Sequence, residues 1–389
     1  MKIPEGFRAA GVACGIKAEG PDLALIASDR PATAAGLFTS NRVKAAPVIY
    51  SRRALRKGRA RAIVANSGCA NACTGPRGLE DARRMARAVA RALEVPEGEV
   101  LVASTGVIGE PLPIERIEGA VPDLAGKLSP QGFEEAARAI MTTDTRPKLR
   151  WATVPTSAGE VTILGIAKGA GMIRPDLATM LAFIVTDAGL SPQELKGMLR
   201  DAVSESFNRI TVDGEQSTND TVFILANGCK GELLGEDLES FGKALMELCQ
   251  GLALDIVRDG EGATMVAEIV ISGARTSAEA RRAAYRIAHS PLVKTALFGR
   301  DPNWGRIMAA LGDAGLKFDP ARVLVRIGGV DVVRGEMVAP NYDEGEAKKA
   351  LTRRKVKIEV DLGLGEGTFS VLTCDLSYDY VKINASYRT

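Results

Sequence analysis

The stretch VTILGIAKGAGMIRPDLATMLAFIVTDA, residues 161–188, decides how this 389-residue chain folds. Residues 161–167 and 180–185 are apolar runs separated by Gly and Pro, a pattern that predicts two buried strands. Thr179 stands directly before the second run, and Lys168 directly follows the first. Ordinary strand and turn chemistry explains this pattern by itself, because Thr is common in strands and Gly and Pro are common in turns. The same pattern also places a hydroxyl at the mouth of a buried strand, near a lysine and a glycine-bearing turn.

Outside this stretch, segments typical of strands and of helices alternate along the chain. A chain of this length suits two lobes or one large domain, and the alternation favours the α/β class. Strands are expected at 23–27, 45–50, 61–65, 100–103, 221–226, 265–272, 322–327, 355–361 and 368–373, and helices at 78–93, 130–141, 191–208, 237–258, 277–290 and 344–351. The tail YVKINASYRT, 380–389, is expected to form a strand with a frayed end.

Charge and hydropathy exclude several classes of protein. The 50 basic and 48 acidic side chains nearly cancel, which argues against a nucleic acid or another general polyanion as partner. The basic run at 52–61 has no aromatic residues and is interpreted as a solvated surface. No stretch approaches the ~20 apolar residues that span a bilayer, and the N-terminus has no signal-peptide core. We therefore expect no membrane contact and a cytoplasmic location.

Cysteine and histidine usage narrows the possible chemistry. The six cysteines are too sparse for a disulfide scaffold. Cys69 and Cys73 lack a nearby His or second Cys pair, so a zinc site is not expected. The single histidine, His289, ends an Arg-rich helical pattern, where a cation suits the helix terminus. A structural role is therefore favoured for it, and an acyl-transfer enzyme of this sequence would need a base other than imidazole.

The motif KGAGM, 168–172, followed by PDLATML, 175–181, resembles the self-cleaving ornithine acetyltransferases, the glutamate N-acetyltransferases of arginine biosynthesis. The likeness runs from GFRAAGVACGIK near the N-terminus through GRDPNWGR to the final INASYRT. It implies a cut between Ala178 and Thr179 that leaves an α chain, 1–178, and a β chain, 179–389. It also implies the fold of that family, two lobes of mixed sheets layered with helices, with a larger N-terminal lobe continuing past the cut and a smaller C-terminal lobe from about residue 275.

The resemblance also implies roles for individual residues. Thr105 and Gly106, in the STGVIG that follows the 100–103 strand, correspond to the oxyanion hole of the family. The implied substrate-binding residues are Thr142, Lys168, Thr179, Glu261, Asn384 and Thr389. Among these, Lys168 suits a substrate carboxylate and Glu261 a substrate ammonium. The residues alone leave a plainer interpretation open, since turns and helix caps also explain such polar clusters.

The mechanism that the resemblance implies explains how a chain with one histidine could activate a hydroxyl. A threonine hydroxyl needs an adjacent base, and the α-amine freed by cleavage has a suitable pKa near ~7.7–8.0. Thr179 would take the acetyl group from N2-acetylornithine, release ornithine, and pass the group to glutamate. This chemistry needs no metal and no cofactor. Acetyl-CoA as a second donor is left open, and the family assembles as a heterotetramer of two α and two β chains.

Two alternative functions remain at this stage. A self-processing amidohydrolase or aminopeptidase would share the Thr nucleophile but pass the acyl group to water. A non-enzymatic, amino-acid-binding regulator of the α/β class would need no self-cleavage. Acetyl transfer that depends on glutamate would distinguish the acetyltransferase from the amidohydrolase or aminopeptidase. Cleaved fragments would distinguish it from the amino-acid-binding regulator.

Overall fold

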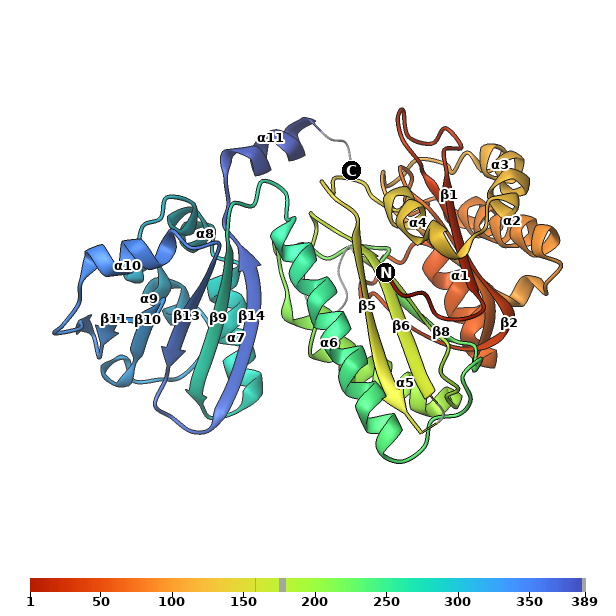
Figure 1. Cartoon of the computed structure of the whole chain (residues 1–389). Coiled ribbons are helices and arrows are strands. Elements are labelled where there is room, and N and C mark those ends of the chain that lie inside the picture. The colour runs from red at the N-terminus through yellow and green to blue at the C-terminus, as the bar shows by residue number, and fades with distance from the viewer. Residues whose placement is uncertain (158, 175–179, 387–389) are drawn as a thin grey trace. The chain divides into compact units, whose positions relative to one another are not determined.

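The computed structural model of the chain describes residues 1–157, 159–174 and 180–386. It divides into two compact units, shown in Figure 1. Among the described residues, the first comprises Met1–Asn208 and Glu215–Ile256, and the second comprises Arg209–Gly214 and residues 257–386. None of the described helices is both long enough and apolar enough to span a bilayer.

The first unit is built on a mixed sheet with the strand order β4-β3-β2-β8-β7-β6-β5, with β1 paired to β2. Strands β7 and β8 run parallel, and all their residues are buried, as expected for strands covered on both faces. The strands predicted on either side of the glycine-bearing turn are confirmed as β6 and β7, which pair antiparallel. The strands are β1 (Phe7–Val12), β2 (Leu23–Phe38), β3 (Arg59–Asn66), β4 (Val100–Ser104), β5 (Lys148–Thr156), β6 (Gly159–Lys168), β7 (Leu181–Thr186) and β8 (Thr221–Ala226).

Strand alternation decides which helices cover each face of this sheet, because successive side chains point to opposite faces. Val64 and Val102 pack in one core with apolar side chains of α2 and α3. Their neighbours Ile63 and Leu101 pack in another core with Phe133 of α4. The helices of this part of the chain are α1 (Ala46–Ala54), α2 (Gly75–Leu93), α3 (Ile114–Gly126), α4 (Phe133–Ala139), α5 (Pro192–Ser204) and α6 (Glu236–Arg258), with single 3₁₀ turns at Leu55–Lys57, Glu97–Glu99, Pro130–Gly132 and Phe207–Arg209.

The second unit has its own sheet, with the order β12-β11-β10-β13-β9-β14. Helix α7 lies along β9 and β14 (Figure 1), and its alanine-rich face enters the core of this unit. The strands are β9 (Val266–Ala274), β10 (Leu324–Ile327), β11 (Val330–Arg334), β12 (Met337–Val338), β13 (Lys355–Asp361) and β14 (Gly367–Cys374). The helices are α7 (Ser277–Ala288), α8 (Pro291–Phe298), α9 (Trp304–Gly312), α10 (Glu344–Leu351) and α11 (Tyr378–Ser386), with a 3₁₀ turn at Pro320–Arg322.

Two segments expected to be strands are helices. The apolar run at 45–50 begins α1, where Pro47 occupies the first turn, a position that suits proline. Ser51 of the same helix exchanges hydrogen bonds with the backbone of Val102, so tertiary contacts fix the helix against β4. The tail forms α11 instead of a strand, and the Asn384 side chain donates to the Tyr380 carbonyl four residues earlier, at 3.0 Å. Neither contact is visible in the local apolar pattern.

Candidate active site

Lys168, the last residue of β6, is the centre of a polar cluster in the first unit. It is 2% exposed, and its Nζ donates to Thr142 Oγ1 at 2.8 Å and to Thr105 Oγ1 at 3.2 Å. A lysine ammonium has only donors, so both threonine oxygens act as acceptors toward it. Each hydroxyl therefore keeps its own hydrogen for a further acceptor. The structure thus brings together three of the residues to which the family resemblance assigns roles.

Asp144 holds this cluster in place, a role that the sequence analysis did not give it. Its Oδ1 accepts from Lys148 Nζ at 2.6 Å and from the Gly169 N–H at 2.7 Å, and its Oδ2 accepts from the Thr142 N–H at 3.1 Å. Burial acts to raise the pKa of Asp144, but the Lys168 and Lys148 cations and the Gly169 N–H outweigh it and hold the pKa below its usual value. The carboxylate therefore offsets buried positive charge and fixes the backbone beside Lys168.

The Thr105–Gly106 turn at the end of β4 supplies hydrogen-bond donors. Gly106 has φ +128°, and a Cβ there would lie 2.3 Å from the carbonyl carbon of Gly68 and 2.6 Å from the nitrogen of Cys69. Only glycine fits so close to another backbone. The Gly106 N–H makes no hydrogen bond to any residue that the structure describes. The turn therefore offers one peptide N–H and one hydroxyl, the two donors that an oxyanion hole requires.

Buried amides hold this turn from behind. Asn219 Nδ2 donates to the carbonyls of Ala70 and Ser104 at 2.7 and 2.8 Å. Asn66 Nδ2 donates to the Cys69 carbonyl at 2.8 Å, and Asn66 Oδ1 accepts from Ser104 Oγ at 2.6 Å. A satisfied buried network of this kind rigidifies the backbone it contacts. The donors of Thr105 and Gly106 are consequently held on a rigid support.

Asp220, directly before β8, contacts the residue that follows the expected nucleophile. It is 0% exposed, and its Oδ1 accepts from the Met180 N–H at 2.9 Å. In the described part of the chain its Oδ2 has no hydrogen-bond partner. Burial raises the pKa of Asp220 well above its usual value, although the Met180 N–H, the Lys168 cation and the Ser217 hydroxyl oppose the rise. A neutral carboxyl group is therefore favoured at this position.

Glu261 and Asn384 lie together in the second unit. Asn384 Nδ2, on α11, donates to Glu261 Oε2 at 2.7 Å, and Glu261 is 7% exposed. At Gly262, φ is +68°, and a Cβ would lie 2.5 Å from Ser377 Oγ and 2.6 Å from the Tyr380 nitrogen. Glycine therefore permits the close approach of α11, and Ser377 Oγ secures it by donating to the Gly262 carbonyl at 2.6 Å. The pair presents one buried carboxylate with an amide that orients it.

Three of the predicted site residues, Ala178, Thr179 and Thr389, lie outside the described residues. His289 caps the C-terminus of α7, with Nε2 3.0 Å from Thr211 Oγ1 and its ring stacked on Tyr285, which fits the structural role expected of it. No cluster of metal-binding side chains occurs within 1–157, 159–174 and 180–386.

Neither Asp144 nor Asp220 was singled out from the sequence as a site residue, although the resemblance gave the segment 213–220 a supporting role. Asp144 belongs to the polar tetrad that follows the 130–141 helix, and local capping explained it adequately. Asp220 had a detectable signal, because an acid stands directly before a buried strand there, as Thr179 stands before the run that becomes β7.

Comparison with known proteins identifies the family. The chain matches the ArgJ family over residues 8–389. It is 51% identical to the arginine biosynthesis bifunctional protein ArgJ of Geobacter sulfurreducens, over 99% of each chain. It is 46% identical to the glutamate N-acetyltransferase of Methanopyrus kandleri, over 100% of each chain. The crystal structure of ArgJ from Bacillus halodurans is 42% identical with a TM-score of 0.50, and the match covers 53% of this chain and 98% of that one. The chain belongs to the ArgJ family.

Proposed function

We propose that this chain is a glutamate N-acetyltransferase of arginine biosynthesis, which moves an acetyl group from N2-acetylornithine to glutamate. The proposal rests mainly on the Lys168 ammonium, which donates a hydrogen bond to the hydroxyl oxygen of Thr105 and another to that of Thr142. Each hydroxyl group can therefore donate its own hydrogen to a substrate oxygen. The Gly106 N–H, which makes no hydrogen bond to any described residue, directly follows Thr105. The curated name of the Methanopyrus kandleri relative supports the same reaction class.

In the first half-reaction, Thr179 Oγ attacks the acetyl carbonyl and its proton passes to the Thr179 α-amine. Thr105 and Gly106 stabilise the oxyanion that forms, and each such donor is typically worth about 10²–10³ in rate. The C–N bond then breaks, the proton passes to the departing nitrogen, and ornithine leaves. In the second half-reaction the glutamate amine attacks acetyl-Thr179, giving N-acetylglutamate and restoring the hydroxyl. A covalent intermediate of this kind predicts ping-pong kinetics.

The remaining residues are assigned to substrate binding. Lys168 binds a substrate carboxylate, assisted by the Thr142 hydroxyl. Glu261 binds a substrate ammonium, and the hydrogen bond from Asn384 orients its carboxylate. Thr389 is proposed as a further substrate ligand at the end of the chain. The two charged side chains, Lys168 and Glu261, are thus each assigned a substrate group of opposite charge.

The proposed nucleophile requires that the chain severs itself between Ala178 and Thr179. The solved Bacillus halodurans chain supports this, since the match covers 98% of it but 53% of this chain, which makes that polypeptide about half as long. A β chain of residues 179–389 would be slightly more than half of this chain. We further propose that two α and two β chains assemble as a heterotetramer, and that the enzyme works in the cytoplasm.

Intact mass of the purified, denatured protein tests the proposal. We expect two fragments that begin at Met1 and Thr179, and acetyl transfer from N2-acetylornithine that outruns hydrolysis when glutamate is present. Thr179→Ala should remain one uncut and inactive chain, while Thr179→Ser, which keeps a hydroxyl, should still divide. If added glutamate does not reduce hydrolysis of N2-acetylornithine in favour of N-acetylglutamate, the protein is the amidohydrolase. If the wild-type chain stays uncut and binds amino acids, it is the regulator. Acetyl-CoA offered in place of N2-acetylornithine tests for a second donor.

A further inference from the structure

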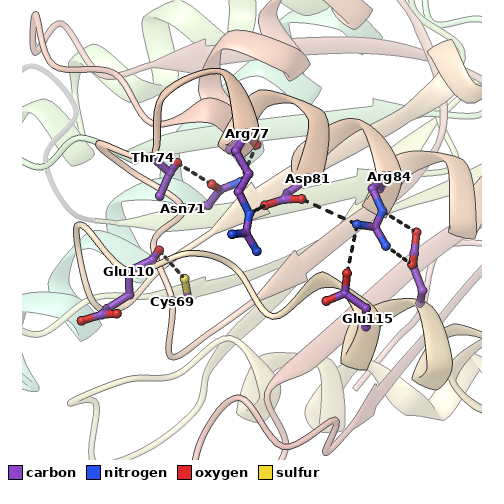
Figure 2. A network of polar contacts seen from close by, with 10 residues as sticks. Cys69, Asn71, Thr74, Arg77, Asp81, Arg84, Glu110 and Glu115 are labelled. Carbon is purple, nitrogen blue, oxygen red and sulfur yellow. Dashed lines mark hydrogen bonds and ion pairs between the residues drawn. The ribbon is translucent and has the colours of Figure 1, made fainter.

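One carboxyl oxygen of the buried Asp220, Oδ2, has no hydrogen-bond partner among the described residues. Among the described residues, Asp81 and Asp220 are the buried aspartates that keep one carboxyl oxygen without a hydrogen bond. Such an oxygen typically costs about 1–3 kcal/mol and calls for an explanation. For Asp81 the explanation is electrostatic, because its side chain lies between Arg77 and Arg84 (Figure 2), with Arg77 Nε 3.6 Å from Oδ2. No comparable ion pair involves Asp220 in the part of the chain that is described.

Asp220 also has an unusual position relative to the expected cut. The nitrogen that it accepts from, Met180 N, is bonded to the carbonyl carbon of Thr179. Three covalent bonds join this nitrogen to the α-nitrogen of Thr179, and their lengths keep the two atoms within about 4 Å of each other in any conformation. Asp220 Oδ1, 2.9 Å from Met180 N, therefore lies within about 7 Å of the scissile nitrogen. The proton transfer requires a Thr179 conformation that brings the two groups together directly or through one water.

We propose that the Asp220 carboxyl group carries the proton that opens the Ala178–Thr179 bond, an inference that rests on the proposed self-cleavage. Thr179 Oγ forms a bond to the Ala178 carbonyl carbon, and the Ala178 C–Thr179 N bond breaks. The carboxyl group gives its proton to the departing nitrogen and regains one from the Thr179 hydroxyl, so that it ends unchanged. Water then hydrolyses the ester, which leaves a carboxylate on Ala178 and the α-amine on Thr179.

The surroundings of Asp220 suit an acid. Complete burial favours the neutral, proton-bearing form, and this form is the one that can donate. Lys168, at the end of β6, is the charged group that acts on it, and the two make no ion pair within the described residues. The Met180 N–H donates to Oδ1, and the Ser217 hydroxyl also acts on the carboxyl group. Among the described residues Oδ2 has no hydrogen-bond partner by geometric criteria.

Cell-free translation with a radiolabelled pulse measures the conversion of full-length chain into the two fragments. Asp220→Asn keeps an oxygen for the Met180 N–H but cannot carry the proton, so we expect cleavage to slow by about 100-fold or more. Asp220→Ala should slow it at least as much. Asp81→Asn is the matched control, because it neutralises the other buried carboxyl group of this kind, and it should cleave at the wild-type rate. Cleavage of Asp220→Asn at the wild-type rate overturns the inference.

A pH profile separates proton transfer from a structural role. The wild-type cleavage rate should fall as pH rises through the raised pKa of Asp220, and this limb should be absent from the residual rate of Asp220→Asn. If circular dichroism shows that the variant does not fold, the wild-type profile decides, and a rate that does not fall with rising pH overturns the inference. A wild-type chain that never divides contradicts the proposed function, whereas equal cleavage of wild type and Asp220→Asn contradicts only the role of Asp220.

Discussion

Replacing Gly106 by alanine tests the oxyanion hole most directly. The added Cβ would lie 2.3 Å from the Gly68 carbonyl carbon, whereas carbon atoms in contact sit at about 3.5–4.0 Å. One of the two backbones must therefore move by more than about 1 Å. A displacement of this size stretches a hydrogen bond of about 2.9 Å beyond its useful range. We therefore expect loss of the Gly106 donor and a kcat for acetyl transfer that is about 10²–10³-fold lower, equivalent to about 2.7–4 kcal/mol of transition-state stabilisation.

The loop also provides a matched control, Gly109→Ala. Gly109 has φ +87°, so alanine also suffers backbone strain there, of about 1–2 kcal/mol, but an added Cβ would meet no atom within 4 Å. Steady-state kinetics of both variants, on protein shown by mass to be cleaved, separates the two effects. Gly109→Ala should lose stability and keep kcat, whereas Gly106→Ala should lose both. A Gly106→Ala enzyme with the kcat of Gly109→Ala would refute the assignment of the Gly106 N–H to the oxyanion hole.

Three further changes test other parts of the site. Thr105→Val keeps the shape but removes a donor, so kcat should fall by about 10²–10³-fold, and an unchanged kcat in the same assay would contradict its role. Asp144→Asn leaves Lys148 buried without its anion and should lower the free energy of unfolding by about 3–5 kcal/mol in urea titrations. Because the pKa of Asp144 is held low, the ionised carboxylate stabilises the fold fully above about pH 3.9, and this stabilisation disappears as pH falls through the folded-state pKa. The difference in unfolding free energy between wild type and variant should therefore shrink in acid. A difference that stays constant with pH would count against the ion pair. Glu261→Gln keeps an oxygen for Asn384 but loses the charge, so the KM for N2-acetylornithine should rise more than kcat falls, and an unaltered KM would exclude an ammonium ligand.

Elements with a continuous local pattern could be predicted from the sequence alone. The expected strands at 221–226 and 355–361 coincide with β8 and β13, and the expected helix at 344–351 coincides with α10. In each case an apolar run or a helical stripe ends at residues that stop it locally. The 45–50 segment failed because its apolar run is short, and short runs fit a buried helix as well as a strand. There the contact between Ser51 and β4 decides the outcome, and that contact joins residues far apart in the sequence.

The residues of the candidate site also fall into two groups, those that the local sequence predicts and those that it does not. Thr105, Thr142 and Lys168 were predicted because they stand in motifs that resemble a family, and the structure places Thr105 and Thr142 each in contact with Lys168. Asp144 could not be predicted from its neighbours alone, because its importance also comes from Lys168 and the Gly169 N–H, which only the folded chain brings to it. Asp220 depends likewise on the pairing of two strands. Residues that act through tertiary partners leave little trace in the local sequence.

Strand pairing explains why these groups meet at one place. Because β7 runs antiparallel to β6 and parallel to β8, the register sets Lys168 opposite Leu181 and Leu181 opposite Thr221, so the end of β6 and the beginnings of β7 and β8 share one edge of the sheet. The turn after β4 approaches the same residues although Ser104 pairs with Asn66 and Asn66 with Leu23, whereas Thr221 pairs with Phe38 at the other end of β2. The register of β2 against β3 shifts between Ala27 and Ala32, and from Thr33 onward β2 pairs with β8. Such irregularities bend a strand. The bond from Asn219 to the Ser104 carbonyl then joins the end of β4 to the segment before β8. The oxyanion donors, the lysine and the buried acid thus converge although β4 and β8 pair toward opposite ends of β2, so we expect a substitution that removed the irregularity of β2 to separate the donors from Lys168 without changing any of them.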